Sequence, residues 1–321
     1  MSNRSTGGRS KPMILADEEH FGQPTALTGK TNDVSVPVKV VAVRRYGTWA
    51  LGLAVLAVLA FVVRAFARAN IEYSLIPGYL VNRSILTGVA HTLELTLLAM
   101  AVGLALGVMT AVMRQTHNPV LRGVALGYTW LFRGTPLLVQ LLIWFNLSIV
   151  FKNLSFFGLY STPMNTLMTP FVAALLGLGV NEGAYIAEIV RSGIISVDDG
   201  QSEAAAALGM PQSLTMRRVV LPQALRVIVP PLGNEFIALL KYSSLAYTIS
   251  YTELLQSANK IYTTNFKVIE LLFTVSIWYI LLTTVFTVFQ QILERRVGRG
   301  HTRPTEGIGR RLAVNLMRFR R

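Results

Sequence analysis

The sequence predicts an all-α, polytopic membrane protein. The chain has 321 residues, of which 52% are hydrophobic and only 14% are charged, whereas soluble domains carry roughly 25% charged residues. Its apolar residues fall in runs of roughly 20 or more, which is the length that a helix needs to cross a bilayer. Backbone polar groups inside lipid must bond within their own segment, so these runs are expected to be helices.

Six transmembrane spans follow from the apolar runs. Each would cross a hydrocarbon layer of about 30 Å at about 1.5 Å per residue. The expected spans are Tyr46–Phe66, Ile85–Met113, Val124–Phe151, Leu167–Val190, Val227–Leu255 and Val268–Leu293, and the polar segment Arg191–Arg226 separates the fourth from the fifth.

These spans divide the chain into four regions. Residues 1–45 form a polar tail, 46–84 an additional N-terminal transmembrane helix with an external loop, 85–295 a transmembrane core, and 296–321 a basic tail. Because the first 45 residues contain no early apolar run, we expect no cleaved signal peptide. The C-terminal tail ends in apolar and basic residues together, so it either lies on anionic lipid headgroups or is solvated.

The charge distribution predicts the orientation. The formal net charge is +14, from 30 Lys and Arg against 16 Asp and Glu. Nucleic-acid binding is one interpretation, but cytoplasmic segments of membrane proteins are also rich in Lys and Arg. With six spans both tails lie on one side, and the cations expected on the other side are Arg64, Arg68, Arg83, Lys152, Lys260 and Lys267. We therefore expect both termini in the cytoplasm, a location in the cell (plasma or inner) membrane, and no nucleic-acid partner.

Several kinds of chemistry are not supported by the sequence. There is no cysteine, and the four histidines (His20, His91, His117 and His301) show no metal-ligand spacing. Gly29-Lys30-Thr31 resembles the end of a phosphate-binding loop, but Pro24 stands where its first glycine should be. We expect no catalytic residue, no metal and no cofactor bound by this chain, so the chain is not predicted to be an enzyme.

A polar segment, Gln201–Pro222, interrupts the apolar chain. It contains Glu203-Ala204-Ala205, a Gly-Met-Pro break at Gly209, and then Val219-x-Leu221-Pro222. The composition predicts two short helices around a turn. The small alanine side chains offer a surface that another protein can approach closely, although an amphipathic surface helix without a partner has the same pattern.

Polar side chains also lie inside the spans. Asn181, Tyr185, Glu188 and Ser192 recur on one helical face, and charges in hydrocarbon cost roughly 2.5 to 3.5 kcal/mol each. They therefore either line a path for cargo or pair internally to hold the helices together. Arg133 and Lys241, near span ends, fit the pairing interpretation better. The candidate path residues are Glu94, Asn181, Tyr185, Glu188, Asn234 and Glu235.

Small residues four apart mark helix contacts. Gly103 and Gly107 in the second span, and Gly179 and Gly183 in the fourth, would let two helix backbones approach closely.

The segment Gln201–Pro222 resembles the EAA loop of ABC importer permeases. Further blocks are similar to the polar amino acid branch of that family, which includes histidine and glutamine permeases, and the similarity covers Ile85 to Arg295. Lys241-Tyr242-Ser243-Ser244 departs from the family, which tends to have Asp or Asn after the lysine. The similar blocks are Leu131–Gln140, Asn181–Ile194 and Leu221–Phe236.

The resemblance implies a permease subunit of an ATP-driven amino acid importer. It implies an ATPase subunit dimer that holds ATP and Mg, a second permease subunit that is identical or homologous, and an extracytoplasmic amino acid-binding protein. The cytoplasmic EAA loop would be the coupling-helix pair. The residues implied in ATPase coupling are Glu203, Ala204, Ala205, Leu208, Gly209, Arg217, Leu221 and Pro222.

Two other functions remain open at this point. A secondary transporter or channel driven by an ion gradient would use Glu94, Glu188 and Glu235 as ion sites, and it would support uptake in vesicles that lack an ATPase. A membrane-embedded enzyme is less consistent with the sequence, because no nucleophile motif or acid pair of useful spacing occurs.

Overall fold

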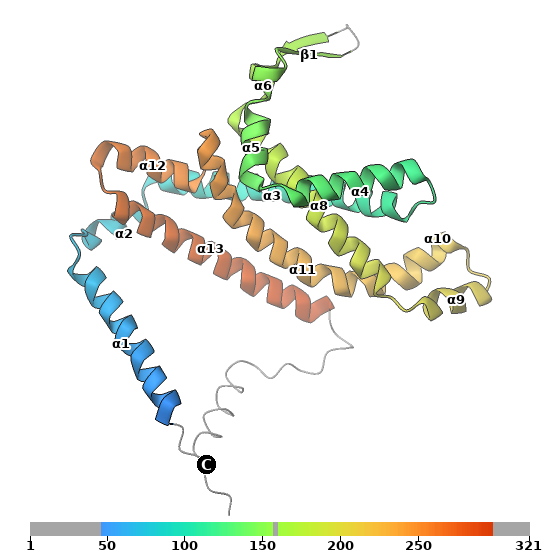
Figure 1. Cartoon of the computed structure of the whole chain (residues 1–321), viewed down its shortest axis with the longest axis horizontal. Helices are drawn as coiled ribbons and strands as arrows, with labels where there is room; N and C mark the ends of the chain where they lie inside the picture. The colour runs from blue at the N-terminus through green and yellow to red at the C-terminus, as the bar shows by residue number, and fades with distance from the viewer. Residues whose placement is uncertain (1–45, 157–159, 298–321) are drawn as a thin grey trace, which may run out of the picture. The chain divides into compact units, whose positions relative to one another are not determined.

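A computed structural model describes residues 46–156 and 160–297, and these residues are almost entirely helical (Figure 1). The strands β1 and β2 pair in a short antiparallel hairpin, with Ser155 opposite Ser161. The all-α prediction did not include this hairpin. The elements are α1 (Tyr46–Arg68), η1 (Tyr73–Leu75), α2 (Ile76–Leu80), α3 (Arg83–Gln115), α4 (Pro119–Gly134), α5 (Leu137–Phe145), α6 (Leu147–Val150), β1 (Asn153–Phe156), β2 (Tyr160–Pro163), α7 (Met164–Leu167), α8 (Pro170–Ile195), α9 (Asp199–Ala207), α10 (Gln212–Thr215), η2 (Met216–Val220), α11 (Leu221–Tyr242), η3 (Ser243–Ile249), α12 (Leu254–Asn265) and α13 (Val268–Val297).

The described chain confirms a polytopic membrane protein. Four of its helices are long and apolar enough to cross a bilayer: most of α1, and the whole of α3, α8 and α13. The helix α1, except its last residue, belongs to a separate unit that ends at Ala67. The predicted tail 1–45 lies outside the described residues, and so does the predicted tail 296–321 apart from Arg296 and Val297, which end α13.

The predicted third span, Val124–Phe151, is not one helix. The helix α4 ends at Gly134, Thr135 is extended (φ −117°, ψ 145°), and Pro136 is the N-cap of α5. A proline disfavours helical geometry in the residue before it, which explains the break. The Gln140 side-chain amide donates to the carbonyls of Phe132 (2.9 Å) and Thr135 (3.1 Å), so acceptors freed by the break are satisfied.

The predicted fifth span, Val227–Leu255, is also wrong in extent. The helix α11 begins at Leu221, with Pro222 in its first turn, and ends at Tyr242. Proline is favoured in a first helical turn because backbone N–H groups there have no partner within the helix, so the N–H that proline lacks is not missed. The residues that follow form the 3₁₀ helix η3, and its C-cap, Ser250, lies in the left-handed region (φ 61°). The helix continues through Pro230 and Pro231.

The main packing contact joins α3 to α8, and it lies at the glycines whose spacing predicts close packing between helices. A Cβ atom on Gly103 would lie 2.9 Å from the Glu182 Cβ and 3.3 Å from the Gly179 carbonyl oxygen. A Cβ atom on Gly183 would lie 3.3 Å from the Gly103 carbonyl oxygen. Since the two backbones approach this closely, only glycine fits at these positions without a shift of one helix.

Several helix termini gather at one end of the unit that begins at Arg68. The end of α3 contacts the end of α8 through Arg114 and Glu188. The N-terminal half of α11 contacts α8 through Ile228 and α13 through Pro230. We call this the basic end, because it carries Arg114, Arg122, Arg191, Arg217, Arg218, Arg226, Arg295 and Arg296. The starts of α3 and α13 and the whole of α12 lie at the opposite end, where the Thr92 hydroxyl accepts from the Leu254 amide (3.1 Å).

The close contact of α3 with α8 predicts opposite effects for two glycine-to-alanine substitutions. A Cβ atom on Gly107 would lie 2.5 Å from Ile186 Cγ2 and 3.1 Å from the Ala187 nitrogen, whereas a Cβ atom on Gly123 in α4 meets nothing within 4 Å. We expect Gly107→Ala to destabilise by about 1–3 kcal/mol, and Gly123→Ala to stabilise by about 0.5–1 kcal/mol. Thermal unfolding of the purified chain measures both, and equal melting temperatures would contradict the packing.

Candidate functional site

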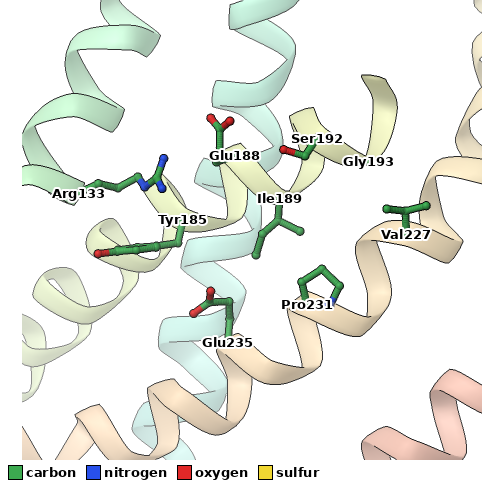
Figure 2. Close-up of a pocket in the computed structure, with 9 residues that line it drawn as sticks. All are labelled: Arg133, Tyr185, Glu188, Ile189, Ser192, Gly193, Val227, Pro231 and Glu235. Atoms are coloured by element: carbon green, nitrogen blue, oxygen red, sulfur yellow. The ribbon is translucent and has the colours of Figure 1, made fainter. Parts of the chain in front are cut away.

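A cavity of about 290 Å³, with a mostly apolar lining that includes three charged side chains, lies between α4, α8 and α11. Figure 2 shows its side chains entering from all three helices. One guanidinium, two carboxylates and the hydroxyls of Tyr185 and Ser192 border it, and the other lining residues are apolar. Its lining residues are Arg133, Tyr185, Glu188, Ile189, Ser192, Gly193, Val227, Pro231 and Glu235.

Arg133 and Glu235 border the cavity as opposite charges from different helices. The Arg133 guanidinium carbon lies 5.3 Å from the centroid of the Tyr185 ring, within the range of a cation–π contact. Among the described residues neither Arg133 nor Glu235 forms an ion pair within 4.0 Å. Figure 2 shows both side chains at the cavity, Arg133 from α4 and Glu235 from α11.

Glu188 differs from Glu235 because it is already paired. Its Oε2 accepts from Arg114 Nη1 (2.5 Å), and its Oε1 accepts from Arg191 Nε (3.0 Å) and Nη2. The three side chains are 17% (Arg114), 26% (Glu188) and 32% (Arg191) exposed. This triad fastens the end of α3 to α8 at the basic end.

Three of the six path residues predicted from the sequence come together in the cavity, namely Tyr185, Glu188 and Glu235. The other three lie elsewhere. Asn181 donates to the Phe132 carbonyl (2.9 Å) and to Gln140 Oε1 (3.1 Å), so it fastens α8 to the break between α4 and α5. Asn234 accepts from Gln290 of α13 (3.0 Å), and Glu94 is exposed on α3.

Sequence patterns alone did not assign Arg133 and Ser192 to this cavity. Ser192 lies on the polar stripe with Tyr185 and Glu188, so its periodicity carried the signal. The place of Arg133 depends on how α4 packs against α8, which its local sequence does not encode. The Arg191 contact with Glu188 follows from their spacing of three residues on one helix.

The segment Gln201–Pro222 forms a helix pair around a tight turn, as its composition predicts. Gly209 follows α9 with φ +75°, its amide donates to the Ala206 carbonyl (2.9 Å), and the Met210 amide donates to the Ala205 carbonyl (3.0 Å). This is the Schellman arrangement, which needs a left-handed residue at its centre. The helix pair extends beyond the ends of α8 and α11 (Figure 1).

Most of the helix pair is accessible from outside. Ala205 is 4% exposed and packs inward, whereas Leu208 is 82% exposed at the turn. Glu203, Ala204 and Arg217 are also exposed, as are Leu221 and Pro222 at the start of α11.

The described residues contain no group of three or more His, Cys, Asp or Glu side chains that could hold a metal ion.

Comparison with protein families identifies the chain. The family model of the "Binding-protein-dependent transport system inner membrane component" matches residues 103–299. The chain belongs to this family. It is therefore a permease, the membrane-embedded subunit of a transport system, and it is not an enzyme.

The relatives agree with this membership. The arginine transport system permease protein ArgU of Corynebacterium glutamicum is 41% identical over 270 residues, which are 83% of this chain and 85% of that protein. The glutamine transport system permease protein GlnP of Escherichia coli is 35% identical over 66% of this chain and 92% of its own length.

Solved structures show the same fold. A crystal structure of an amino acid ABC transporter with histidines matches with a TM-score of 0.62 and 34% identity, over 71% of this chain and all of that one. The MetNI methionine ABC transporter matches with a TM-score of 0.53 at 22% identity, over 70% of this chain and 97% of that chain, which supports the fold alone.

The paired state of Glu188 can be tested by a double-mutant cycle. We expect Arg114→Met and Glu188→Gln to be coupled by about 1 kcal/mol, since each substitution removes the same partly buried contact. Thermal or denaturant unfolding of the wild type, both single variants and the double variant gives the coupling energy. Strict additivity would show that the contact between α3 and α8 contributes nothing.

Proposed function

We propose that this permease forms the translocation path of an ATP-driven importer for polar amino acids, together with a second permease subunit. The observation that carries the proposal is the cavity between α4, α8 and α11, where Arg133 and Glu235 present opposite charges from two helices. An α-amino acid has a carboxylate and an ammonium close together, so it matches such a pair. The relatives named for arginine and glutamine transport support the same cargo class.

Within the cavity, each group has a distinct role. The Arg133 guanidinium binds the cargo carboxylate, because a planar fork of donors matches two carboxylate oxygens. Glu235 binds the cargo ammonium. The Tyr185 ring, already in contact with Arg133, holds the guanidinium in position. The paired Glu188 keeps the wall of the cavity closed toward the basic end.

Coupling to ATP hydrolysis takes place at the exposed helix pair α9–α10. A short connection links α9 to α8, and α10 passes through η2 into α11. Both α8 and α11 carry cavity residues. A displacement of the helix pair by an ATPase subunit therefore acts directly on the two helices that hold the cargo site. Glu203, Ala204, Ala205, Leu208, Gly209, Arg217, Leu221 and Pro222 belong to this docking segment.

The partners follow from this arrangement. The basic end faces the cytoplasm, as the rule for Lys and Arg indicates, and both termini lie on that side of the cell membrane. Two ATPase subunits carry ATP and Mg there. An extracytoplasmic amino acid-binding protein delivers cargo at the opposite end, and the second permease is identical or homologous.

The structure offers little support for an ion-gradient transporter. Glu188, one of its candidate ion sites, is occupied by two arginines, and Glu94 lies outside the cavity. Uptake by proteoliposomes that contain the permease without an ATPase would favour that alternative.

Substitutions at Gly209 test the coupling role. No atom of the described residues lies within 4 Å of a Cβ added there, so the cost of substitution comes from the positive φ. Asparagine tolerates this region, whereas a β-branched residue does not. We expect Gly209→Val to reduce ATP-dependent uptake about tenfold or more, from a loss of about 1–2 kcal/mol in turn stability, and Gly209→Asn to retain most uptake.

Uptake and ATP hydrolysis should be measured together in proteoliposomes that contain the assembled transporter. Unchanged uptake by a properly assembled Gly209→Val transporter would contradict the coupling role.

Removal of either cavity charge tests the cargo site. We expect Arg133→Gln and Glu235→Gln each to weaken binding or uptake about tenfold or more, since a charge-assisted bond contributes about 1.5–3 kcal/mol. Glu294→Gln is a matched control, because Glu294 lies on α13 and lines no part of the cavity. Uptake of labelled amino acids measures the effect. Wild-type affinity in both cavity variants would place cargo binding elsewhere.

A further inference from the structure

A second cavity, of about 320 Å³, lies at the opposite end of the unit, between the first turns of α3 and the helix α12. Its composition differs from that of the first cavity, because it combines two cations with four hydroxyl groups and includes no carboxylate. Its lining residues are Arg83, Ser84, Thr87, Thr252, Ser257 and Lys260.

Close packing holds the two walls of this cavity in place. A Cβ atom on Gly88 of α3 would lie 2.5 Å from Ser257 Oγ and 2.9 Å from Leu254 Cα. The Lys260 ammonium donates to the Thr252 hydroxyl (2.7 Å), which fixes the charge at the cavity wall. The site is therefore formed by the fold and does not depend on a loose loop.

The two cations have no ionic partner among the described residues. In the part of the chain that the structure describes, no carboxylate oxygen lies within 4.0 Å of Arg83 or Lys260. Lys267, at the same end, is paired with Glu72, and that hydrogen bond raises the pKa of the Lys267 ammonium. Arg83 and Lys260 are also among the few cations that depart from the charge asymmetry of the chain. A bound anion would compensate both.

The lining fits a phosphate group. A guanidinium donates two parallel hydrogen bonds to phosphate oxygens, an ammonium adds a point charge, and hydroxyls add further donors. The helix α3 begins at Arg83, and the positive end of its dipole favours a negative charge there.

We propose that this cavity binds the phosphate group of a phospholipid headgroup. The helix that begins at Arg83 is long and apolar enough to span a membrane, and the cavity at its first turns is placed by this proposal at the level of the lipid phosphates. Below it, Leu86 (43% exposed) and Leu97 (55% exposed) lie on the same side of α3 as Arg83. They give an acyl chain an apolar surface. The inference depends on the membrane fold and is independent of the cargo.

Native mass spectrometry of the full-length permease in detergent, with phosphatidylglycerol added, tests the proposal. We expect Lys260→Gln to retain bound lipid about fivefold less well, and the Arg83→Gln, Lys260→Gln double variant about thirtyfold less well. Lys152→Gln removes the same charge from an exposed residue outside the cavity, so it should retain lipid as the wild type does. Elution volume and melting temperature without added lipid show whether each variant is folded, and the single variant suffices if the double variant is not.

Three results would overturn the proposal. Equal retention of phosphatidylglycerol by the wild type and by the folded variants would show that no lipid phosphate binds here. Displacement of the lipid by inorganic phosphate at equal concentration would identify a site for soluble anions. Normal lipid retention in the double variant, with loss of stimulation by the binding protein, would identify an acidic protein surface as the occupant.

Discussion

The close contact between α3 and α8 is the constraint on which the rest of this permease depends. Each glycine in the contact lies against backbone or Cβ atoms of the other helix. In lipid the hydrophobic effect does not drive helices together, so close packing has to supply much of the free energy of their association. The helix α8 is thereby fixed along much of its length, and the cavity residues that it carries are fixed with it.

Charged groups reinforce this contact at its basic end. A lone carboxylate at the position of Glu188 would be costly, and two arginines from different helices offset that cost. The triad also restricts what Glu188 can do, because a carboxylate held by two guanidiniums is not free for cargo. Charge in the membrane therefore has two uses in this chain. One joins helices, and the other, at Arg133 and Glu235, leaves opposite charges exposed to a cavity.

The sequence predicted the features that depend on local composition and period. The four long apolar helices follow from the length of their apolar runs. The close packing follows from glycines four residues apart, and the helix pair follows from the turn residue Gly209. The polar stripe on α8 predicted Tyr185 and Glu188 as neighbours in space. Pro136 gave a local signal for the break in the third span, but the strongly apolar residues around it outweighed that signal.

Features that depend on tertiary packing could not be read in the same way. Nothing in the sequence near Arg114 or Arg133 indicates that each lies against α8, since those contacts depend on how α3 and α4 cross it. Asn181 shares the polar stripe, yet its bonds go to the break between α4 and α5. Periodicity identifies a face of a helix, but only the neighbouring helix decides whether a side chain on that face lines a cavity or forms a structural bond.

The short π-helix η2 sets the rotational register between the two functional parts of the chain. It continues without interruption from α10 into α11. A π-helical turn holds one residue more than an α-helical turn requires, and one residue in an α-helix corresponds to a rotation of about 100°. The direction in which α9 and α10 point, relative to Glu235 on α11, therefore depends on a single extra residue within Met216–Val220. The number of residues in Met216–Val220, as well as their identity, therefore affects the angle at which a partner bound to α9 and α10 would meet the permease.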